Sequence, residues 1–102
     1  HIMGAPEFAA CKRTAILTNI SRGGLVDEAA LLAALRSGTI AGAGLDATER
    51  EPLPPGDPLW EAPNLIVSPH CAGSTSPVTH LRAAARIAEN LVKFRHGTLV
   101  PT

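Results

Sequence analysis

The chain has 102 residues, a formal net charge of +0 and 45% hydrophobic residues, which fits one small globular domain. The neutral balance gives no electrostatic reason to expect nucleic acid or an anionic membrane as a partner. No apolar run approaches the roughly 20 residues of a membrane-spanning helix. Cys11 and Cys71 are too few for a disulfide framework, so we expect both to be reduced in a cytoplasmic protein. Cys71 has no zinc-ligand spacing with His70 or His80, so no metal site is expected.

The first eight residues, 1–8, show no hydrophobic periodicity and carry a methionine at the third position. We interpret them as a tag and linker scar that stays outside the fold. No apolar stretch long enough for a signal peptide follows them. The domain is therefore expected to occupy residues 9–102.

The first predicted strand covers 14–20, a short apolar run with β-branched residues that is typical of a strand buried on both faces of a parallel sheet. A loop over 21–24 follows. Asp27 can cap a helix over 28–37, and Gly38 suits the left-handed residue that ends it. The helix presents one apolar face, formed by Leu31, Leu32 and Leu35.

The second predicted strand covers 40–46 and is rich in glycine and alanine, which indicates close packing by a neighbouring group. The proline-rich segment 49–58 excludes helix and inner strand, and Trp60 is expected to pack against it. A third short strand is expected over 65–68. Ser76, followed by proline, begins a long helix. The apolar stripe of that helix consists of Val78, Leu81, Ala85, Ala88, Leu91 and Val92.

This order of strand, helix, strand, loop, strand and helix predicts a parallel α/β sheet with right-handed crossovers. Ligands of such sheets bind at the carboxyl ends of the strands. Charged side chains follow all three predicted strands: Arg22 the first, Asp46 and Glu51 the second, and His70 the third. We therefore expect a functional site at this edge of the sheet.

At these residues the chain resembles the D-isomer-specific 2-hydroxyacid dehydrogenases. The matching motifs are TNISRGGLVD at 18–27, AGLD at 43–46, EPL at 51–53 and NLIVSPH at 64–70. The resemblance extends over about residues 12–100. It implies the C-terminal half of a Rossmann-type nucleotide-binding domain, a three-stranded parallel sheet with flanking helices, whose last helix returns to a substrate domain that this sequence lacks.

The resemblance also implies roles for the charged residues. Arg22 would bind the carboxylate of a small 2-oxo or 2-hydroxy acid and polarise its 2-oxo group. His70 would be the proton donor and acceptor, with Glu51 paired to it, and Asp46 would hold the nicotinamide carboxamide. The cofactor-binding residues implied in this way are Ile20, Ser21, Arg22, Asp46, His70 and Gly73.

These residue types suit the chemistry that the resemblance implies. Reduction of a 2-oxo acid places a hydride on carbon and a proton on oxygen, and a histidine titrates in the range that proton transfer needs. A neighbouring carboxylate favours the charged form of that histidine. An arginine offers a planar fork that matches a carboxylate and keeps its charge. The hydride itself would come from NAD or NADP.

A dinucleotide domain also needs a glycine-rich turn after its first strand and an acidic residue about 20 residues later. Residues 42–47 fit the bare spacing of glycines, but they lie inside a predicted strand that no helix follows, so we treat this match as chance. We therefore expect the isolated chain to bind no cofactor, and the choice between NAD and NADP stays open.

Three functions stay open at this point. The chain can be a fragment of a 2-hydroxyacid dehydrogenase, and segment 51–60 is most similar to glyoxylate/hydroxypyruvate reductases within the family. It can be a catalytically incompetent fragment that self-associates, as a homodimer, because the strand over 14–20 presents an open apolar edge. It can also be a corepressor-like binding protein on the same fold.

Overall fold

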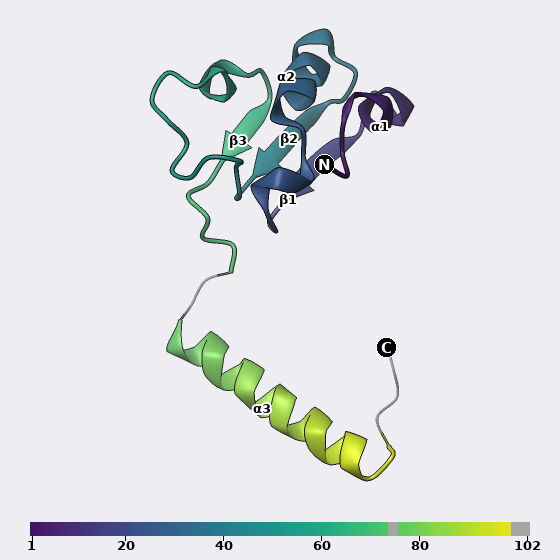
Figure 1. Ribbon diagram of the computed structural model, residues 1–102, viewed down its shortest axis with the longest axis vertical. Coiled ribbons are helices and arrows are strands. Elements are labelled where there is room, and N and C mark those ends of the chain that lie inside the picture. Colours follow the sequence, from purple (N-terminus) through teal and green to yellow (C-terminus); the bar gives the residue numbers. More distant parts are fainter. Residues whose placement is uncertain (74–75, 99–102) are drawn as a thin grey trace.

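The computed structural model describes residues 1–73 and 76–98 of the chain. Three parallel strands form one sheet in the order β1-β2-β3: β1 (Ile16–Asn19), β2 (Gly42–Leu45) and β3 (Leu65–Val67). Figure 1 shows them side by side, with β2 in the centre. The predicted parallel α/β sheet is confirmed. Each strand is shorter than expected, because the residues at its ends leave the ladder for the adjoining loops.

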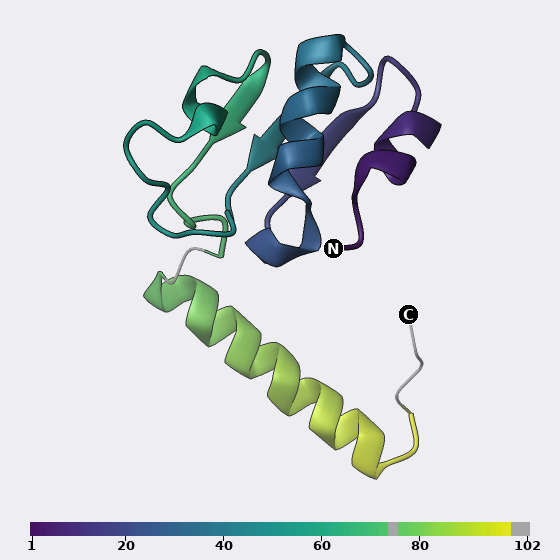
Figure 2. The ribbon, with the colours of Figure 1, turned by 45° about the horizontal axis from the view of Figure 1, so that its top comes forward.

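The helices are α1 (Ala5–Ala10), α2 (Glu28–Ser37) and α3 (Pro77–Arg95), with two short 3₁₀ turns, η1 (Gly23–Leu25) and η2 (Pro58–Glu61). Helix α2 lies across one face of the sheet, and α1 packs beside it (Figure 2). No helix among the described residues combines the length and the apolarity that crossing a bilayer requires.

Helix α2 begins and ends where its sequence predicts. The Asp27 carboxylate accepts a hydrogen bond from the Ala30 backbone N–H at 2.9 Å, which satisfies a free donor of the first turn. Gly38 takes the left-handed conformation, with φ of 68°, and ends the helix. The apolar face of α2 packs on the sheet and forms the centre of the core. The buried core residues are Phe8, Val26, Leu31, Ala34, Leu35, Ile40, Ala43, Leu45 and Leu59.

The prediction that the first strand is buried on both faces is wrong. The strand register places Thr18 beside Gly44 and Gly44 beside Ile66, so these residues share the face of the sheet opposite α2. On this open face Ile16 is 72% exposed and Ile66 is 75% exposed. The β-branched run does form a strand, but its burial depends on a covering layer that the described residues do not supply.

The prediction that residues 1–8 stay outside the fold is also wrong. Met3 forms a parallel bridge with Val26, and its carbonyl accepts from the Asp27 N–H at 2.9 Å. Phe8, on the inner side of α1, is only 1% exposed and belongs to the core. Burial of this aromatic ring removes a large apolar surface from water, which overrides the lack of periodicity in so short a segment.

Helix α3 has the predicted start, since the Ser76 hydroxyl accepts from the Thr79 N–H at 3.2 Å. None of its residues is buried, and it extends away from the sheet in both views (Figures 1 and 2). Its apolar stripe is therefore open to solvent, with Leu81 70% exposed and Leu91 63% exposed.

The loops after β1 and β2 meet backbone to backbone at Gly23. A Cβ atom added at Gly23 would lie 2.0 Å from the carbonyl carbon of Thr48 and 2.4 Å from the backbone nitrogen of Glu49. Only a residue without a side chain permits this approach. Gly24, the next residue, has no atom within 4 Å of the same position.

We expect Gly23→Ala to lower the free energy of unfolding by about 1–3 kcal/mol, because the new methyl group must push the backbone at Thr48 aside. Gly24→Ala is the matched control and should change it by less than about 0.5 kcal/mol. Urea denaturation of the 102-residue chain, followed by far-UV circular dichroism, measures both. Equal unfolding midpoints for the two variants would show that the close approach of the two loops at Gly23 does not contribute to stability.

Candidate functional site

The carboxyl ends of the three strands gather polar side chains at one edge of the sheet, as the parallel topology predicts. Asn19 ends β1, Asp46 follows β2, and Ser68 and His70 follow β3. Glu51 reaches the same edge from the long loop after β2. The site is therefore assembled from three segments that are distant in sequence.

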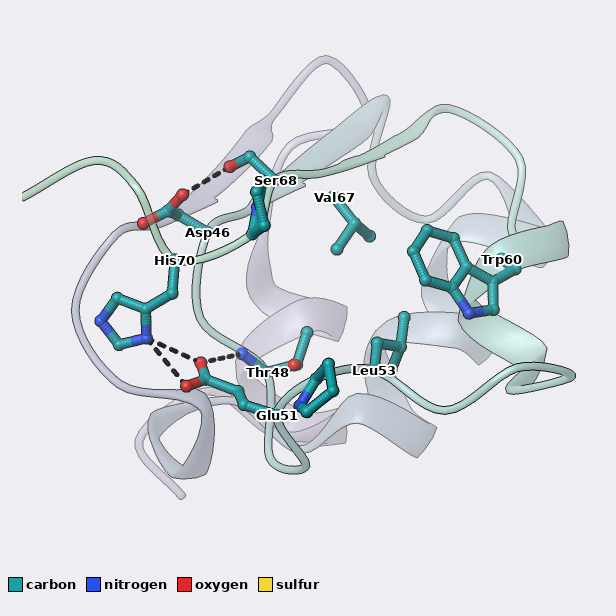
Figure 3. A pocket seen from close by; sticks show the side chains of 10 residues that line it. Asp46, Thr48, Glu51, Leu53, Trp60, Val67, Ser68 and His70 are labelled. Atoms are coloured by element: carbon teal, nitrogen blue, oxygen red, sulfur yellow. Dashed lines mark hydrogen bonds and ion pairs between the residues drawn. The ribbon is translucent and has the colours of Figure 1, made fainter. Parts of the chain in front are cut away.

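His70 and Glu51 form a hydrogen-bonded pair, the His70–Glu51 pair, with two short contacts. The His70 Nδ1 lies 2.9 Å from Oε1 and 2.8 Å from Oε2 of the Glu51 carboxylate (Figure 3). Oε1 also accepts from the Thr48 backbone N–H at 3.1 Å. The hydrogen bond with His70 and then that with Thr48 hold the pKa of Glu51 below its ordinary value. Glu51 is thus an anion, fixed in place behind the imidazole.

Asp46 is 5% exposed, and its carboxylate accepts three hydrogen bonds. Its Oδ1 accepts from the Ser68 hydroxyl at 2.6 Å and from the Cys71 N–H at 2.9 Å, and its Oδ2 accepts from the Ala72 N–H at 2.8 Å. These bonds, the Ser68 bond first and the Ala72 bond next, lower the pKa of Asp46 to about 2 against the opposing effect of desolvation. The carboxylate is therefore charged and organises the turn that contains His70.

Arg22 lies in the loop after β1, which the Asn19 side chain stabilises. The Asn19 amide donates to the Arg22 carbonyl at 2.8 Å, and its oxygen accepts from the Ser21 N–H at 3.1 Å. The Arg22 guanidinium is exposed and donates to the Ser21 carbonyl at 2.7 Å. It does not contact His70, although its charge makes a small contribution to the low pKa of Glu51.

A cavity of about 320 Å³ lies behind the His70–Glu51 pair, between the proline-rich loop and β3. Its walls are largely apolar, with Leu53, Trp60 and Val67 opposite the His70–Glu51 pair (Figure 3). The Trp60 indole N–H donates to the Pro54 carbonyl at 2.9 Å, so the predicted packing of this tryptophan against the loop is confirmed.

A second hollow, of about 190 Å³, opens on the uncovered face of the sheet near the carboxyl ends of the strands. Two of the predicted cofactor residues line it, Ile20 and Asp46. Ser21 and Gly73 are exposed and are not part of its wall. The other residues that line the hollow are Thr18, Gly44, Leu45, Ile66, Ser68, Cys71 and Ala72.

Sequence reasoning missed three residues that build the site: Asn19, Thr48 and Ser68. Asn19 and Ser68 each stand at the end of an apolar run, where a polar residue signals the exit from a strand. Thr48 acts through its backbone N–H, which no sequence pattern reveals. Within residues 1–73 and 76–98, no group of three or more His, Cys, Asp or Glu side chains could hold a metal ion.

The fold and the site together define a class of protein: part of a parallel α/β nucleotide-binding domain with a histidine–carboxylate pair at the carboxyl ends of its strands. The family model described as the D-isomer specific 2-hydroxyacid dehydrogenase, NAD binding domain, matches residues 1–72. The chain belongs to this family, as the sequence motifs predict. The match begins at residue 1, which agrees with the packing of the first eight residues into the core.

Named relatives support the family. The chain is 50% identical over 101 residues to the glyoxylate reductase of Korarchaeum cryptofilum and covers 30% of its length. It is 46% identical over 97 residues to the glyoxylate/hydroxypyruvate reductase B of Citrobacter koseri, again 30% of that protein. The alignments cover 99% and 95% of this chain. The chain therefore spans about a third of the length of the curated relatives that it matches.

Solved structures have the same fold. A D-isomer specific 2-hydroxyacid dehydrogenase from Xanthobacter autotrophicus Py2, in complex with NADPH and MES, matches with a TM-score of 0.71 and 48% identity, over 97% of this chain and 40% of the other. An NADPH-dependent glyoxylate/hydroxypyruvate reductase from Sinorhizobium meliloti, in complex with citrate, matches with a TM-score of 0.68 and 42% identity, over 90% and 29% of the two chains.

The hydrogen bonds of Asp46 predict how the stability of the folded chain changes in acid. Because its pKa is lowered from 3.8 to about 2 in the folded chain, its contribution to stability is complete above about pH 4 and is lost as the pH falls towards 2. In Asp46→Asn, an amide nitrogen faces N–H or O–H donors, so we expect lower stability at neutral pH and a shallower loss of stability between about pH 4 and 2.

Urea denaturation midpoints of the chain and of Asp46→Asn, measured in steps from about pH 7 to about pH 2, test this expectation. The two curves should run parallel above about pH 5 and converge below about pH 4. Parallel curves over the whole range would mean that Asp46 takes up no extra proton when the chain unfolds.

Proposed function

We propose that this chain is the part of an NAD(P)-dependent 2-hydroxyacid dehydrogenase, of the glyoxylate/hydroxypyruvate reductase kind, that carries the acid–base pair and the substrate arginine. The observation that carries the proposal is the contact of 2.8 Å between His70 Nδ1 and the Glu51 carboxylate at the carboxyl ends of the parallel strands. In the longer protein, this part would end in the helix that returns to the substrate domain. The names of the relatives above support the substrate class, a small 2-oxo or 2-hydroxy acid.

His70 would transfer the proton. Since its Nδ1 faces Glu51, this nitrogen carries the hydrogen, and Nε2 is the nitrogen left for substrate. In Figure 3 Nε2 points away from Leu53 and Trp60. During reduction, Nε2–H of the imidazolium would give its proton to the oxygen of the 2-oxo group while hydride reaches the carbon. Glu51 would stabilise the imidazolium and set the orientation of the ring.

Arg22 would bind the substrate carboxylate. Its guanidinium is exposed, and its bond to the Ser21 carbonyl leaves other N–H groups of the planar fork free for a bidentate pair. The loop that carries it is fixed by the Asn19 amide and by the close approach at Gly23. A substrate held by this fork would bridge from Arg22 to His70.

The hollow on the open face of the sheet has a chemistry that fits the nicotinamide end of the cofactor. Ile20 and Ile66 supply apolar walls for a flat ring. A carboxylate has about four lone-pair sites, and Asp46 uses three of them, so one remains for a carboxamide N–H. The cofactor would supply the hydride. We propose that the isolated chain does not retain the cofactor, because no glycine-rich phosphate turn occurs in a suitable context.

The acid–base role of His70 can be tested in the full-length protein. We expect His70→Gln to lower kcat for NADPH- or NADH-dependent reduction of hydroxypyruvate and glyoxylate by about 10²–10⁴-fold, because glutamine cannot exchange a proton near neutral pH. His80→Gln, on the exposed surface of α3, is the matched control and should leave kcat unchanged. Full turnover by His70→Gln, or no reduction of any 2-oxo acid by the unaltered protein, would refute the proposal.

We also propose that the isolated chain self-associates, as a homodimer. Two apolar surfaces lie open, the sheet face with Ile16 and Ile66 and the stripe of α3 with Leu81 and Leu91. A small domain that leaves such surfaces in water gains stability by burying them against a second copy.

Light scattering should therefore give the mass of a dimer for the 10.6 kDa chain, both with and without NADH. Ile66→Lys, which places a charge on the open sheet face, should shift the mass to that of a monomer. Ile2→Lys, at a residue that is 69% exposed and belongs to no strand of the sheet, is the control. A folded monomer at all concentrations would refute self-association. A monomer that binds NADH would refute the proposal that the isolated chain does not retain the cofactor.

A further inference from the structure

His70 sits in a backbone conformation that is rare for its residue type. Its φ is +52°, in the left-handed region that disfavours a residue with a Cβ atom. Such a conformation persists only where surrounding contacts hold it. The contact between its ring and Glu51 lies at the tip of the side chain, so the backbone needs a separate anchor.

The anchor is the Asp46 carboxylate, whose hydrogen bonds come from both sides of His70. The Ser68 hydroxyl precedes His70 in sequence, and the N–H groups of Cys71 and Ala72 follow it. The His70 N–H itself donates to the Ser68 carbonyl at 3.0 Å. The turn over 68–72 is thus closed around one carboxylate.

Asp46 is held rigidly in place because it follows β2, the central strand, and is almost completely buried. The Ser68 hydroxyl makes the shortest of its three hydrogen bonds, at 2.6 Å, as expected for a hydroxyl that donates to an anion. This bond fixes the rotation of the carboxylate, on which the alignment of both backbone N–H bonds depends. Ser68 is also tied to β2 by its own N–H, which donates to the Leu45 carbonyl at 2.9 Å.

We infer that Ser68 is a positioning residue for His70. Its hydroxyl orients the Asp46 carboxylate, the carboxylate holds the turn in the left-handed conformation, and the turn presents Nδ1 of His70 to Glu51 with Nε2 free. The inference rests on the proposed acid–base role of His70, but the orientation of the ring can be measured without any turnover.

Long-range proton–nitrogen correlation spectra of the isolated chain, labelled with ¹⁵N in histidine, report which ring nitrogen carries the proton. His70→Gln assigns the signals. We expect the unaltered chain to show the Nδ1–H form of neutral His70, and Ser68→Ala to show a mixture with the Nε2–H form, because the turn no longer holds Nδ1 against Glu51. Ser68→Thr, which retains the hydroxyl, should restore the Nδ1–H form. Ser37→Ala, which removes a hydroxyl at the end of α2, is the matched control.

In the full-length protein, Ser68→Ala should lower kcat by about ten- to a hundredfold through misplacement of the proton donor, with a small change in KM for the 2-oxo acid and with rescue by threonine. If Ser68→Ala unfolds the isolated chain, Asp46→Asn gives the same test of the His70 signals. Unchanged ring signals in a folded Ser68→Ala chain would overturn the inference. An unaltered full-length protein without reductase activity would instead overturn the proposed function, while the ring signals would still test the role of Ser68.

Discussion

The buried carboxylate of Asp46 is the constraint on which the site depends. It stands at the end of the central strand and collects hydrogen bonds from Ser68, Cys71 and Ala72, so the chain that leaves β3 must wrap around it. A buried anion is costly unless its hydrogen bonds are satisfied, and here the same bonds that satisfy it also shape the turn that presents His70. The hydrogen bonds that stabilise the buried charge of Asp46 therefore also set the path of the backbone in the turn.

The opposite wall of the site depends on a steric constraint. The Gly23 backbone touches the backbone at Thr48, which brings the loop of Arg22 against the loop of Glu51. Thr48 in turn donates its N–H to Glu51. An arginine and a carboxylate that are 29 residues apart in sequence are thus placed through one glycine contact and one backbone hydrogen bond. The glycine contact is made by backbone atoms alone, whereas the hydrogen bond ends on the Glu51 carboxylate and so also orients that side chain.

The two faces of the sheet explain how far local patterns predict structure in this chain. Capping by Asp27, the left-handed Gly38 and the apolar face of α2 act within a few residues, and the predicted helix matches the observed one from Glu28 to Ser37. The β-branched run of β1 indicates a strand equally well, but burial of its second face requires a partner layer, and Ile16 stays open. Phe8 shows the reverse case, since a segment without periodicity is drawn into the core by one aromatic ring.

The order of strands and helices, the parallel topology, the family and the edge that carries Arg22, Asp46, Glu51 and His70 could all be predicted from the sequence, because they follow from periodicity, capping and motif order. The atoms that meet in the site could be identified only in the packed structure. It paired His70 Nδ1 with Glu51, used Asp46 to hold the turn, and brought in Asn19, Thr48 and Ser68. The contacts of His70 with Glu51 and of Ser68 with Asp46 join segments 19 and 22 residues apart, and the packing of the strands sets their distances. The contacts of Asn19 and Thr48 are local, but each involves a backbone group, which a pattern of side chains does not reveal.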